Sequence, residues 1–502
     1  MKKALSALLI IAGTLVQFSC SKELNLKPIS AATALTFYAT TNDFLQGINA
    51  AYSSLKDYPD RQLNLSETRS DNLYAVSDGG VRDWEGINNF QRGITSNPYI
   101  TSAWVNNFNG IYKANVLLDQ LQKNGTVIAD ASLRTRLEAE ARFLRAFFYF
   151  DLVRWFGEVP LVQKPLALDE AIGIPRNSVT DVYNLIISDL KFAGDNLPAP
   201  DGYAAADKGR ATKWAAKGIL ALVYMTRSAP TYDIKGPGLG LNEWSQAASL
   251  LNEIIASGKY TFLSAYSNIF SYTNENNSEV VFDVEYISGQ NPVIGSSFPS
   301  LLVPDVYFRS LGKLDQNGLS IRPVSNSLYN SYEAADNRRA FSTQKGFVYN
   351  GDVETRPFFK KYLDITKIPT KAVDWPVNFV MLRYTDVLML KAECVLHGAP
   401  GSQAADVDAV VNQVRARAGL APRNGVTLLQ LFDERRREFA GEGSRWHDLV
   451  RSGSIEAIMN AWIAADDAQH KIAPFQKNYI IYPVPQSEMD INHGVFIQNA
   501  GY

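Results

Sequence analysis

Two stretches of the sequence without helical or strand periodicity combine aromatic rings with planar polar side chains. The first, within residues 59–100, contributes Asp71, Asn72, Arg82, Trp84, Asn88 and Asn89. The second, within residues 261–381, contributes Tyr286, Phe298, Tyr307, Arg309, Arg322 and Trp375. Flat rings can stack on the apolar face of a sugar, and amide or guanidinium groups can hydrogen-bond its hydroxyls. These residue types favour noncovalent binding of a polar, ring-shaped ligand.

Trp84 and Trp375 are the two tryptophans that we expect to contact such a ligand, because both lie outside any periodic run. If their segments face each other, the two rings form a stacking platform; the alternative is that each ring plugs a loop onto the scaffold. Asp71 and Asn72 are also compatible with ordinary turn chemistry. Trp104, Trp155 and Trp214 lie in helical patterns, and we assign them to the core.

Catalytic and metal-binding patterns are absent from the sequence. None of the four histidines has a second histidine or cysteine at metal-ligand spacing, and no phosphate loop or nucleophile elbow occurs. A glycosidase needs two carboxylates across a cleft, whereas Glu279, Asp283 and Glu285 are predicted on one face of one strand. The formal net charge of −2 gives no basic field for nucleic acid. We therefore expect a protein without enzymatic activity, cofactor or metal.

Residues 133–160 form the helix around which the rest of the chain is organised. Apolar side chains recur every three or four residues in two rows, which indicates packing on two sides. Gly157 is the expected C-terminal stop, and Pro160 prevents continuation. Arg142 and Arg145 lie three residues apart and are expected to share carboxylate partners on a neighbouring helix. Arg145 should be paired in the interior.

A second charged segment, residues 435–451, places opposite charges at helical spacing. Arg437, Glu438, Glu442, Arg445 and Asp448 are predicted to form a buried ion-pair network that joins two helices. Buried pairs of this kind specify geometry more than they add stability. The Arg435-Arg436-Arg437 run belongs to the same pattern and is not predicted to be a phosphate-binding patch.

The remaining periodicity predicts a mostly α-helical protein. Paired helical segments fill residues 42–260 and 382–460, and they flank an irregular insertion at residues 261–381 that contains short strands and loops. Residues 279–287 alternate and are rich in β-branched and aromatic side chains, which predicts a strand. We expect residues 42–502 to form one domain.

The N-terminus has the features of a secretory signal. Lys2 and Lys3 precede an apolar run that is too short to span a membrane and ends just before Cys20. A cysteine after a small residue at this place resembles a lipoprotein processing site, although Gln17 stands where leucine is usual. Cleavage would leave residues 1–19 as signal peptide, Cys20 as the lipidated residue and residues 20–41 as a tether.

Five segments, in order, resemble the SusD/RagB family of outer-membrane nutrient-binding lipoproteins. They are SDNLY (70–74), WVNNFNGIYKANVLLD (104–119), AEARFLRAFFYFDLVRWFGEVPL (139–161), RRREFAGEGSRWHDLVR (435–451) and YPVPQSEMDINHGVFIQNAGY (482–502). The resemblance implies a tetratricopeptide-like helical-hairpin scaffold, lipid-anchored on the outer membrane. It further implies that the protein captures an oligosaccharide and delivers it to a SusC-like TonB-dependent transporter. The alternatives are binding of peptides or other oligomers, a protein-interaction scaffold and a glycoside hydrolase.

Overall fold

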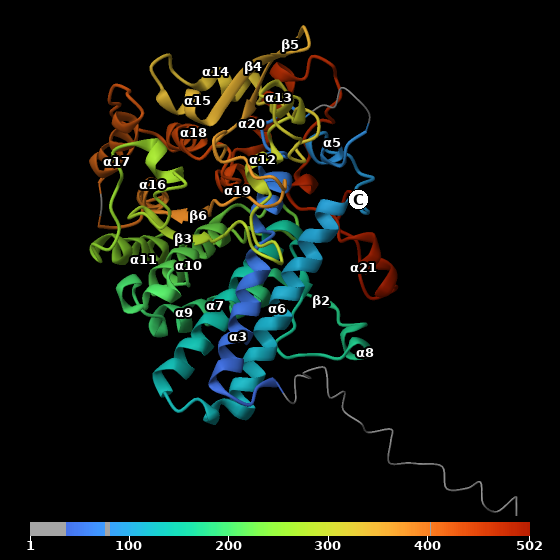
Figure 1. The fold of residues 1–502 in the computed structure, drawn as a ribbon, viewed down its shortest axis with the longest axis vertical. Helices are drawn as coiled ribbons and strands as arrows, with labels where there is room; N and C mark the ends of the chain where they lie inside the picture. The colour runs from blue at the N-terminus through green and yellow to red at the C-terminus, as the bar shows by residue number, and fades with distance from the viewer. Residues whose placement is uncertain (1–36, 76–80, 402) are drawn as a thin grey trace, which may run out of the picture.

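Helices stacked in chain order build most of the protein (Figure 1). The computed structural model describes residues 37–75, 81–401 and 403–502, so Cys20 lies outside the described residues. The main helices are α3 (Thr41–Tyr52), α6 (Pro98–Asn124), α7 (Ala131–Phe156), α9 (Val179–Asn196), α10 (Lys213–Ser228), α11 (Trp244–Ala256), α16 (Tyr384–Leu396) and α17 (Ala404–Arg417). From α6 to α17, each of these helices packs against the next, which confirms the predicted scaffold of paired helices.

Helix α7 is the buried centre of this stack. The Asp130 side chain caps its N-terminus by accepting the backbone N–H groups of Ser132 and Leu133. Both predicted apolar rows are buried, between α6 on one side and α9 on the other. The helix ends at Phe156, and Gly157 follows at a φ of 70°, as expected for a glycine stop. At the α6–α7 crossing, a Cβ atom on Gly110 would lie 2.4 Å from the Phe148 ring, so only glycine permits this approach.

Arg145 is paired in the interior, as predicted. Its Nε and Nη2 atoms donate to the two carboxylate oxygens of Asp189 on α9, at 2.7 and 2.9 Å. Arg142 donates to the same carboxylate at 3.4 Å, which confirms the shared partner. Asp189 is fully buried, and its pairing with these arginines joins α7 to α9.

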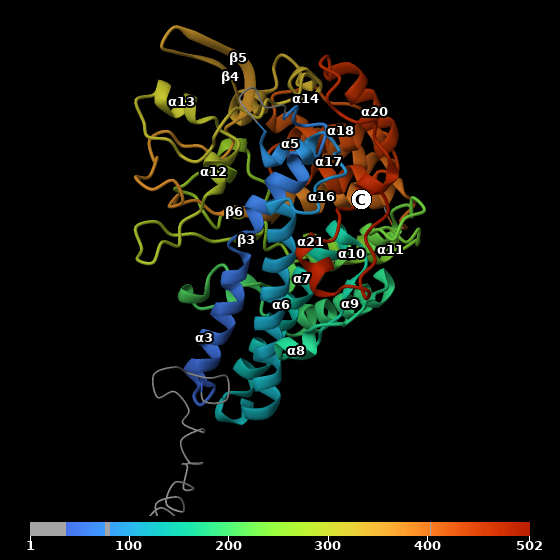
Figure 2. The same cartoon turned by 90° about the vertical axis from the view of Figure 1, so that its right-hand side faces the viewer.

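The insertion carries the short strands. Strand β3 (Val280–Val284), within the predicted segment, pairs antiparallel with β6 (Phe379–Arg383), which leads directly into α16. Strands β4 (Thr343–Tyr349) and β5 (Asp352–Phe359) form an antiparallel hairpin that projects from the body (Figure 2). Four short helices lie between β3 and β4: α12 (Phe298–Leu301), α13 (Asp305–Ser310), α14 (Asn326–Ser331) and α15 (Asn337–Ser342). Hairpin and α3 lie at opposite ends of the molecule (Figure 1).

The expectation of an irregular segment from residue 59 is wrong for its first part. Helix α4 (Tyr58–Arg61) continues into a π-helical turn at Gln62–Glu67, and nearly every residue from 58 to 73 is buried. Its polar side chains bond to the scaffold: Arg61 and Gln62 both donate to the buried carboxylate of Asp151 on α7. The polar composition of this segment did not indicate a core element, because its polar groups form their hydrogen bonds inside the protein.

A buried group of charges, here called the Glu438 cluster, joins the insertion to the helical scaffold. Its members are Glu279, Arg338, Lys361, Arg383, Arg417, Glu438 and Glu442. The Glu438 carboxylate accepts from Arg417 at 2.6 Å, Arg383 at 2.8 Å and Arg338 at 3.1 Å. These arginines come from α17, β6 and α15, and Glu438 ends α18 (Leu428–Glu438). The five residues of the predicted network are buried and ion-paired, but not with one another. Glu438 and Glu442 belong to this cluster, whereas Arg437 pairs with Glu434, Arg445 with Asp71, and Asp448 with Arg435 and Arg451.

Within the part of the chain that the structure describes, no helix is both long enough and apolar enough to cross a lipid bilayer. The structure thus offers residues 37–75, 81–401 and 403–502 no helical means of spanning a membrane.

Replacing Arg145 with alanine should lower the free energy of unfolding by about 3–5 kcal/mol, because the buried Asp189 carboxylate loses its closest partner. Urea denaturation measures the change. Lys123→Ala is the matched control: Lys123 forms a 2.9 Å pair with Asp119, but its side chain is 63% exposed. That variant should lose less than about 1 kcal/mol. Equal midpoints for the Arg145 variant and the unmodified protein would contradict the interior role.

Candidate functional site

The first predicted stretch does not form a ligand surface. Asp71 is buried, and its carboxylate accepts from Arg445 at 2.8 and 2.9 Å and pairs with Arg436 at 3.2 Å. Asn72 accepts from Arg436 and donates to Glu67. The signature around Asp71 therefore attaches the N-terminal part of the domain to the segment after α18, and neither side chain is available to a ligand.

Trp84 and Trp375 are buried, so the predicted stacking platform is wrong. Only 1% of Trp84 is exposed, and the Arg322 guanidinium lies 4.0 Å above its ring centre. Trp375 is 0% exposed, and its backbone exchanges two hydrogen bonds with Ser296. Both rings take the alternative role of plugging loops onto the body. The lack of periodicity around these two tryptophans indicated irregular backbone, but it did not indicate exposure, because irregular backbone can also be buried.

Four more predicted residues also have structural roles. Asn88 is buried; it donates to the carbonyls of Thr68 and Leu73 and accepts from the Ala75 N–H. The Tyr286 hydroxyl donates to the Lys56 carbonyl at 2.5 Å. The other two are Asn89, which is buried, and Arg82, which is half-buried with its guanidinium 5.9 Å from the Trp84 ring centre.

Arg309 and Tyr307 lie on α13, and only Tyr307 reaches a cavity. Arg309 is exposed and pairs with Asp315 at 2.9 Å. Tyr307 is half-buried; its ring centre lies 5.0 Å from that of Phe358 and 5.6 Å from that of Phe347. Its hydroxyl has no hydrogen-bond partner among the described residues. Tyr307 is therefore the one predicted residue that the structure leaves free to contact a ligand in a pocket.

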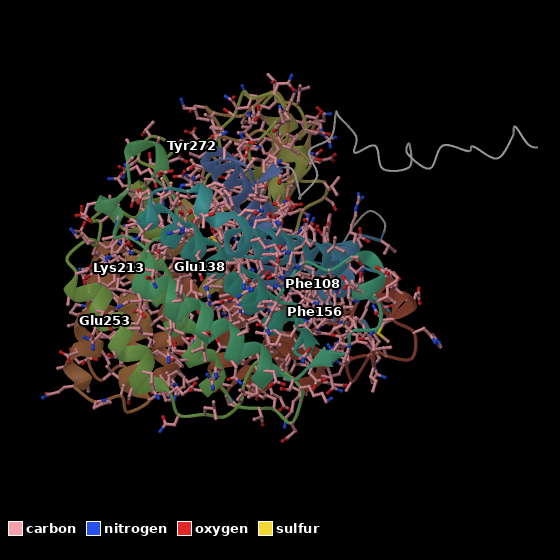
Figure 3. The ribbon with its side chains drawn as sticks, turned by 90° about the horizontal axis from the view of Figure 1, so that it is seen from below. Phe108, Glu138, Phe156, Lys213, Glu253 and Tyr272 are labelled. Atoms are coloured by element: carbon pink, nitrogen blue, oxygen red, sulfur yellow. The ribbon has the colours of Figure 1, made fainter. Side chains whose placement is uncertain are left out.

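The cavity beside Tyr307, here called the insertion pocket, has a volume of about 420 Å³. It is lined by Ser267, Phe270, Ser271, Tyr272, Tyr307, Ala340, Phe341, Lys360, Lys361, Tyr362, Leu363, Asp364 and Ile365. All of these residues belong to the insertion, and they come from the segment before β3, from α13 and α15, and from the chain after β5. Tyr272 lies toward the outer edge of the molecule when seen from below (Figure 3).

Aromatic rings give the insertion pocket its apolar surface. Tyr272, Tyr307 and Phe341 are half-buried, so part of each remains open to solvent. Phe270 and Tyr362 lie deeper, with ring centres 5.3 Å apart in an edge-to-face contact. Several half-open rings beside hydroxyl, ammonium and carboxylate groups can bind a sugar without any reacting group.

Sequence reasoning missed most of this pocket. Tyr272, Phe341 and Lys360 are near neighbours only in the fold, because 19 or more residues separate each from the next along the chain. The available signal was the run Lys360-Lys361-Tyr362 in an aperiodic segment, where two adjacent lysines and a tyrosine depart from the helical pattern.

Two other cavities are chemically less suited to a sugar. One, of about 620 Å³, is lined by α6, α7 and α9 and contains Glu138, which Figure 3 places near the middle of the lower face. The other, of about 470 Å³, surrounds Arg176 and the C-terminal segment. None of the described residues that line either cavity is aromatic, and Arg176 is occupied by backbone carbonyls of Phe156, Glu158 and Ile497.

Each carboxylate of the β3 segment has a hydrogen-bond partner within the protein. Glu279 accepts from Arg383 and Arg417 within the Glu438 cluster. Asp283 accepts from the Asn378 amide at 3.2 Å, and Glu285 accepts from Asn276 at 2.6 Å. Among the residues the structure describes, no group of three or more His, Cys, Asp or Glu side chains could hold a metal ion.

Burial raises the pKa of Asp283 to about 8, and the nearby charge of Glu285 adds to the rise. The folded protein thus holds a proton that the unfolded chain releases above a pH of about 4. Stability from this group is complete below that pH and is lost as the pH rises toward 8.

Asp283→Asn should remove this pH dependence. Between about pH 5 and pH 8, the unfolding free energy of the unmodified protein should fall relative to the variant, by at most about 1.4 kcal/mol per pH unit. Urea denaturation at several pH values measures the difference, with the exposed Asp352→Asn on β5 as control. Parallel pH profiles for the Asp283 variant and the unmodified protein would contradict the assignment.

Two family models match parts of this chain. A model described as "Starch-binding associating with outer membrane" matches residues 27–225, and a model of the SusD family matches residues 325–502. A SusD-like protein of Bacteroides ovatus is 28% identical over 473 residues, 89% of this chain and 82% of the relative. The starch-binding protein SusD of Bacteroides thetaiotaomicron is 24% identical over 446 residues, 78% of this chain and 76% of the relative.

Solved structures share the fold over nearly the whole chain. A laminarin-binding SusD-like protein is 27% identical and superposes with a TM-score of 0.73, covering 93% of this chain and 100% of that one. Surface glycan-binding protein A of Bacteroides thetaiotaomicron, in complex with laminarihexaose, is 23% identical with a TM-score of 0.78, covering 92% and 100%. The two family models match the two sides of one continuous fold, so residues 27–225 and 325–502 of this chain are similar to SusD-family proteins.

Proposed function

We propose that the protein binds an oligosaccharide in the insertion pocket and has no catalytic activity of its own. The observation that carries this proposal is the free Tyr307 hydroxyl in a cavity of about 420 Å³, where the Tyr307 ring and those of Tyr272 and Phe341 are half-buried. Relatives named for starch and laminarin binding support a glycan as the ligand class. The groups in the pocket can stack on and hydrogen-bond a sugar without breaking any bond in it.

A helical scaffold cannot itself move a hydrophilic oligomer through a bilayer, so capture would serve import only together with a partner protein. We propose delivery to a SusC-like TonB-dependent transporter in the outer membrane, an association that the name of one matching family model supports. Binding must then be modest, so that the sugar can pass from the pocket to the transporter.

The anchor in this proposal is a lipid on Cys20. Helix α3 follows the expected tether and lies at the end of the molecule opposite the β4–β5 hairpin (Figure 1). A lipid attached ahead of α3 would hold that end near the membrane and present the insertion on the far side. This arrangement leaves the insertion pocket open to glycans arriving from outside the cell.

Tyr307→Ala should weaken binding of the glycan by about 1–3 kcal/mol, the range typical of one lost stacking ring. Calorimetry on the full-length chain in detergent measures it, with laminarihexaose as the first sugar tested. Tyr307→Phe keeps the ring and should lose only the contribution of the hydroxyl.

Tyr112→Ala serves as the matched control, since Tyr112 is 50% exposed on α6 and does not line the pocket. That variant should bind as the unmodified protein does. Unchanged affinity in Tyr307→Ala, with a glycan that does bind, would place the site outside the insertion pocket.

Cys20→Ala should release the protein from the membrane fraction, because the lipid has no other attachment point in the proposal. Cell fractionation with a high-salt wash measures this release. The unmodified protein, purified in mild detergent, should bring a large TonB-dependent barrel with it. Retention of the variant in washed membranes would contradict the lipid anchor, and recovery of the protein alone would contradict the transporter partnership.

A further inference from the structure

Two adjacent lysines after strand β5 have opposite environments. The Lys361 ammonium is buried in the Glu438 cluster, where it donates to Glu442 at 2.5 Å and to the Ala440 carbonyl at 2.9 Å. Lys360 is half-buried in the insertion pocket, and its ammonium donates only to the Gln344 amide oxygen, at a long 3.4 Å. Across the residues that the structure describes, no carboxylate lies within ion-pair distance of Lys360.

The backbone fixes Lys360 in this position. Its N–H donates to the Ser342 carbonyl at 2.9 Å, and its carbonyl accepts from the Leu363 N–H at 2.8 Å. The ammonium is therefore attached to an ordered turn at the end of a strand. Burial in the pocket lowers the pKa of Lys360, which expresses the cost of holding a charge there without a partner.

Of the two other charged side chains in the lining, Lys361 pairs with Glu442, and Asp364 does not pair with Lys360. One Asp364 carboxylate oxygen accepts from both the Thr366 N–H at 2.9 Å and the Thr366 hydroxyl at 2.7 Å, so this side chain closes its own turn. The polar groups available to a ligand are the Lys360 ammonium, the Tyr307 hydroxyl and the second Asp364 carboxylate oxygen, whereas the Ser271 hydroxyl bonds to Thr273 and the Tyr272 hydroxyl donates to the Tyr362 carbonyl. The pocket thus offers rings for stacking beside one cation that lacks a protein anion.

We propose that the insertion pocket is built for an anionic glycan, whose carboxylate or sulfate ester pairs with Lys360 while its sugar ring stacks on the neighbouring aromatic side chains. This inference rests on the proposed function, and it adds the chemical class of the sugar. An anion supplied by the ligand gives the half-buried ammonium the partner that the protein lacks. Charge-assisted hydrogen bonds of this kind are among the stronger polar contacts.

The experiment compares three oligosaccharides of similar length by calorimetry on the full-length chain in detergent. They are neutral laminarihexaose, an oligouronate and a sulfated oligosaccharide. At low salt, at least one charged sugar should bind roughly tenfold more tightly than the neutral one, the size expected for one hydrogen bond between charged groups. Raising the salt concentration should shrink that preference.

Lys360→Met should abolish the preference and leave binding of the neutral sugar close to that of the unmodified protein. Lys360→Arg should retain it, because the charge is kept. The control is Lys313→Met, an exposed lysine of the insertion that does not line the pocket, and it should change nothing. Preference for only one charged sugar identifies carboxylate or sulfate as the recognised group.

Two outcomes would overturn the inference, and they differ in what else they overturn. If laminarihexaose binds as tightly as both charged sugars, and Lys360→Met changes the affinity for none of the three, the proposal of an anionic ligand is wrong. Glycan binding itself would still be supported. If none of the three sugars binds, both the proposed oligosaccharide binding and the inference of an anionic ligand are contradicted. A melting temperature for each variant confirms that lost binding does not reflect lost folding.

Discussion

A single buried carboxylate, that of Glu438, is the constraint on which the rest of the structure depends. Glu438 is 0% exposed, and burial alone would raise its pKa, but the charges of Arg417, Arg383 and Arg338 hold that pKa well below its ordinary value. A charge in the interior is tolerated only with such complete pairing. Because the three partners come from α17, β6 and α15, the helical scaffold and the insertion can be assembled in only one relative position. The insertion pocket inherits its shape from this junction, since Lys361 reaches the cluster from the pocket wall.

The sequence supports the scaffold far better than it supports the site. The double apolar rows of α7, the interior position of Arg145 and the charged segment around Glu438 were predictable because each shows in the spacing of residues along its own helix, and local spacing is what a sequence displays directly. The pocket is different in kind, because its lining comes from segments whose proximity depends on tertiary structure. The burial of Trp84 was also not predictable from local sequence. Its neighbours in the chain are polar, but those polar groups bond to protein partners and the ring is interior.

Rigidity and adaptability are divided between the two parts of the molecule. The scaffold holds polar groups in networks within the protein, such as the one around Asp151, whose carboxylate accepts from Arg61, Gln62 and Asn107. The insertion keeps half-open rings and an unpaired ammonium at its surface. Binding chemistry located on irregular segments above a fixed frame can change with the ligand while the frame remains the same.

Lys360 and Lys361 give this division an evolutionary consequence. Lys360 directly follows the last residue of β5 and Lys361 lies in the turn that comes next, and their ammonium groups have different partners: Gln344 beside the insertion pocket and Glu442 in the Glu438 cluster. An insertion or deletion between β5 and Tyr362 would displace Lys361 from its carboxylate partner in the Glu438 cluster. A substitution at position 360 would leave that pair in place, so the pocket wall can change while the junction between insertion and scaffold is kept.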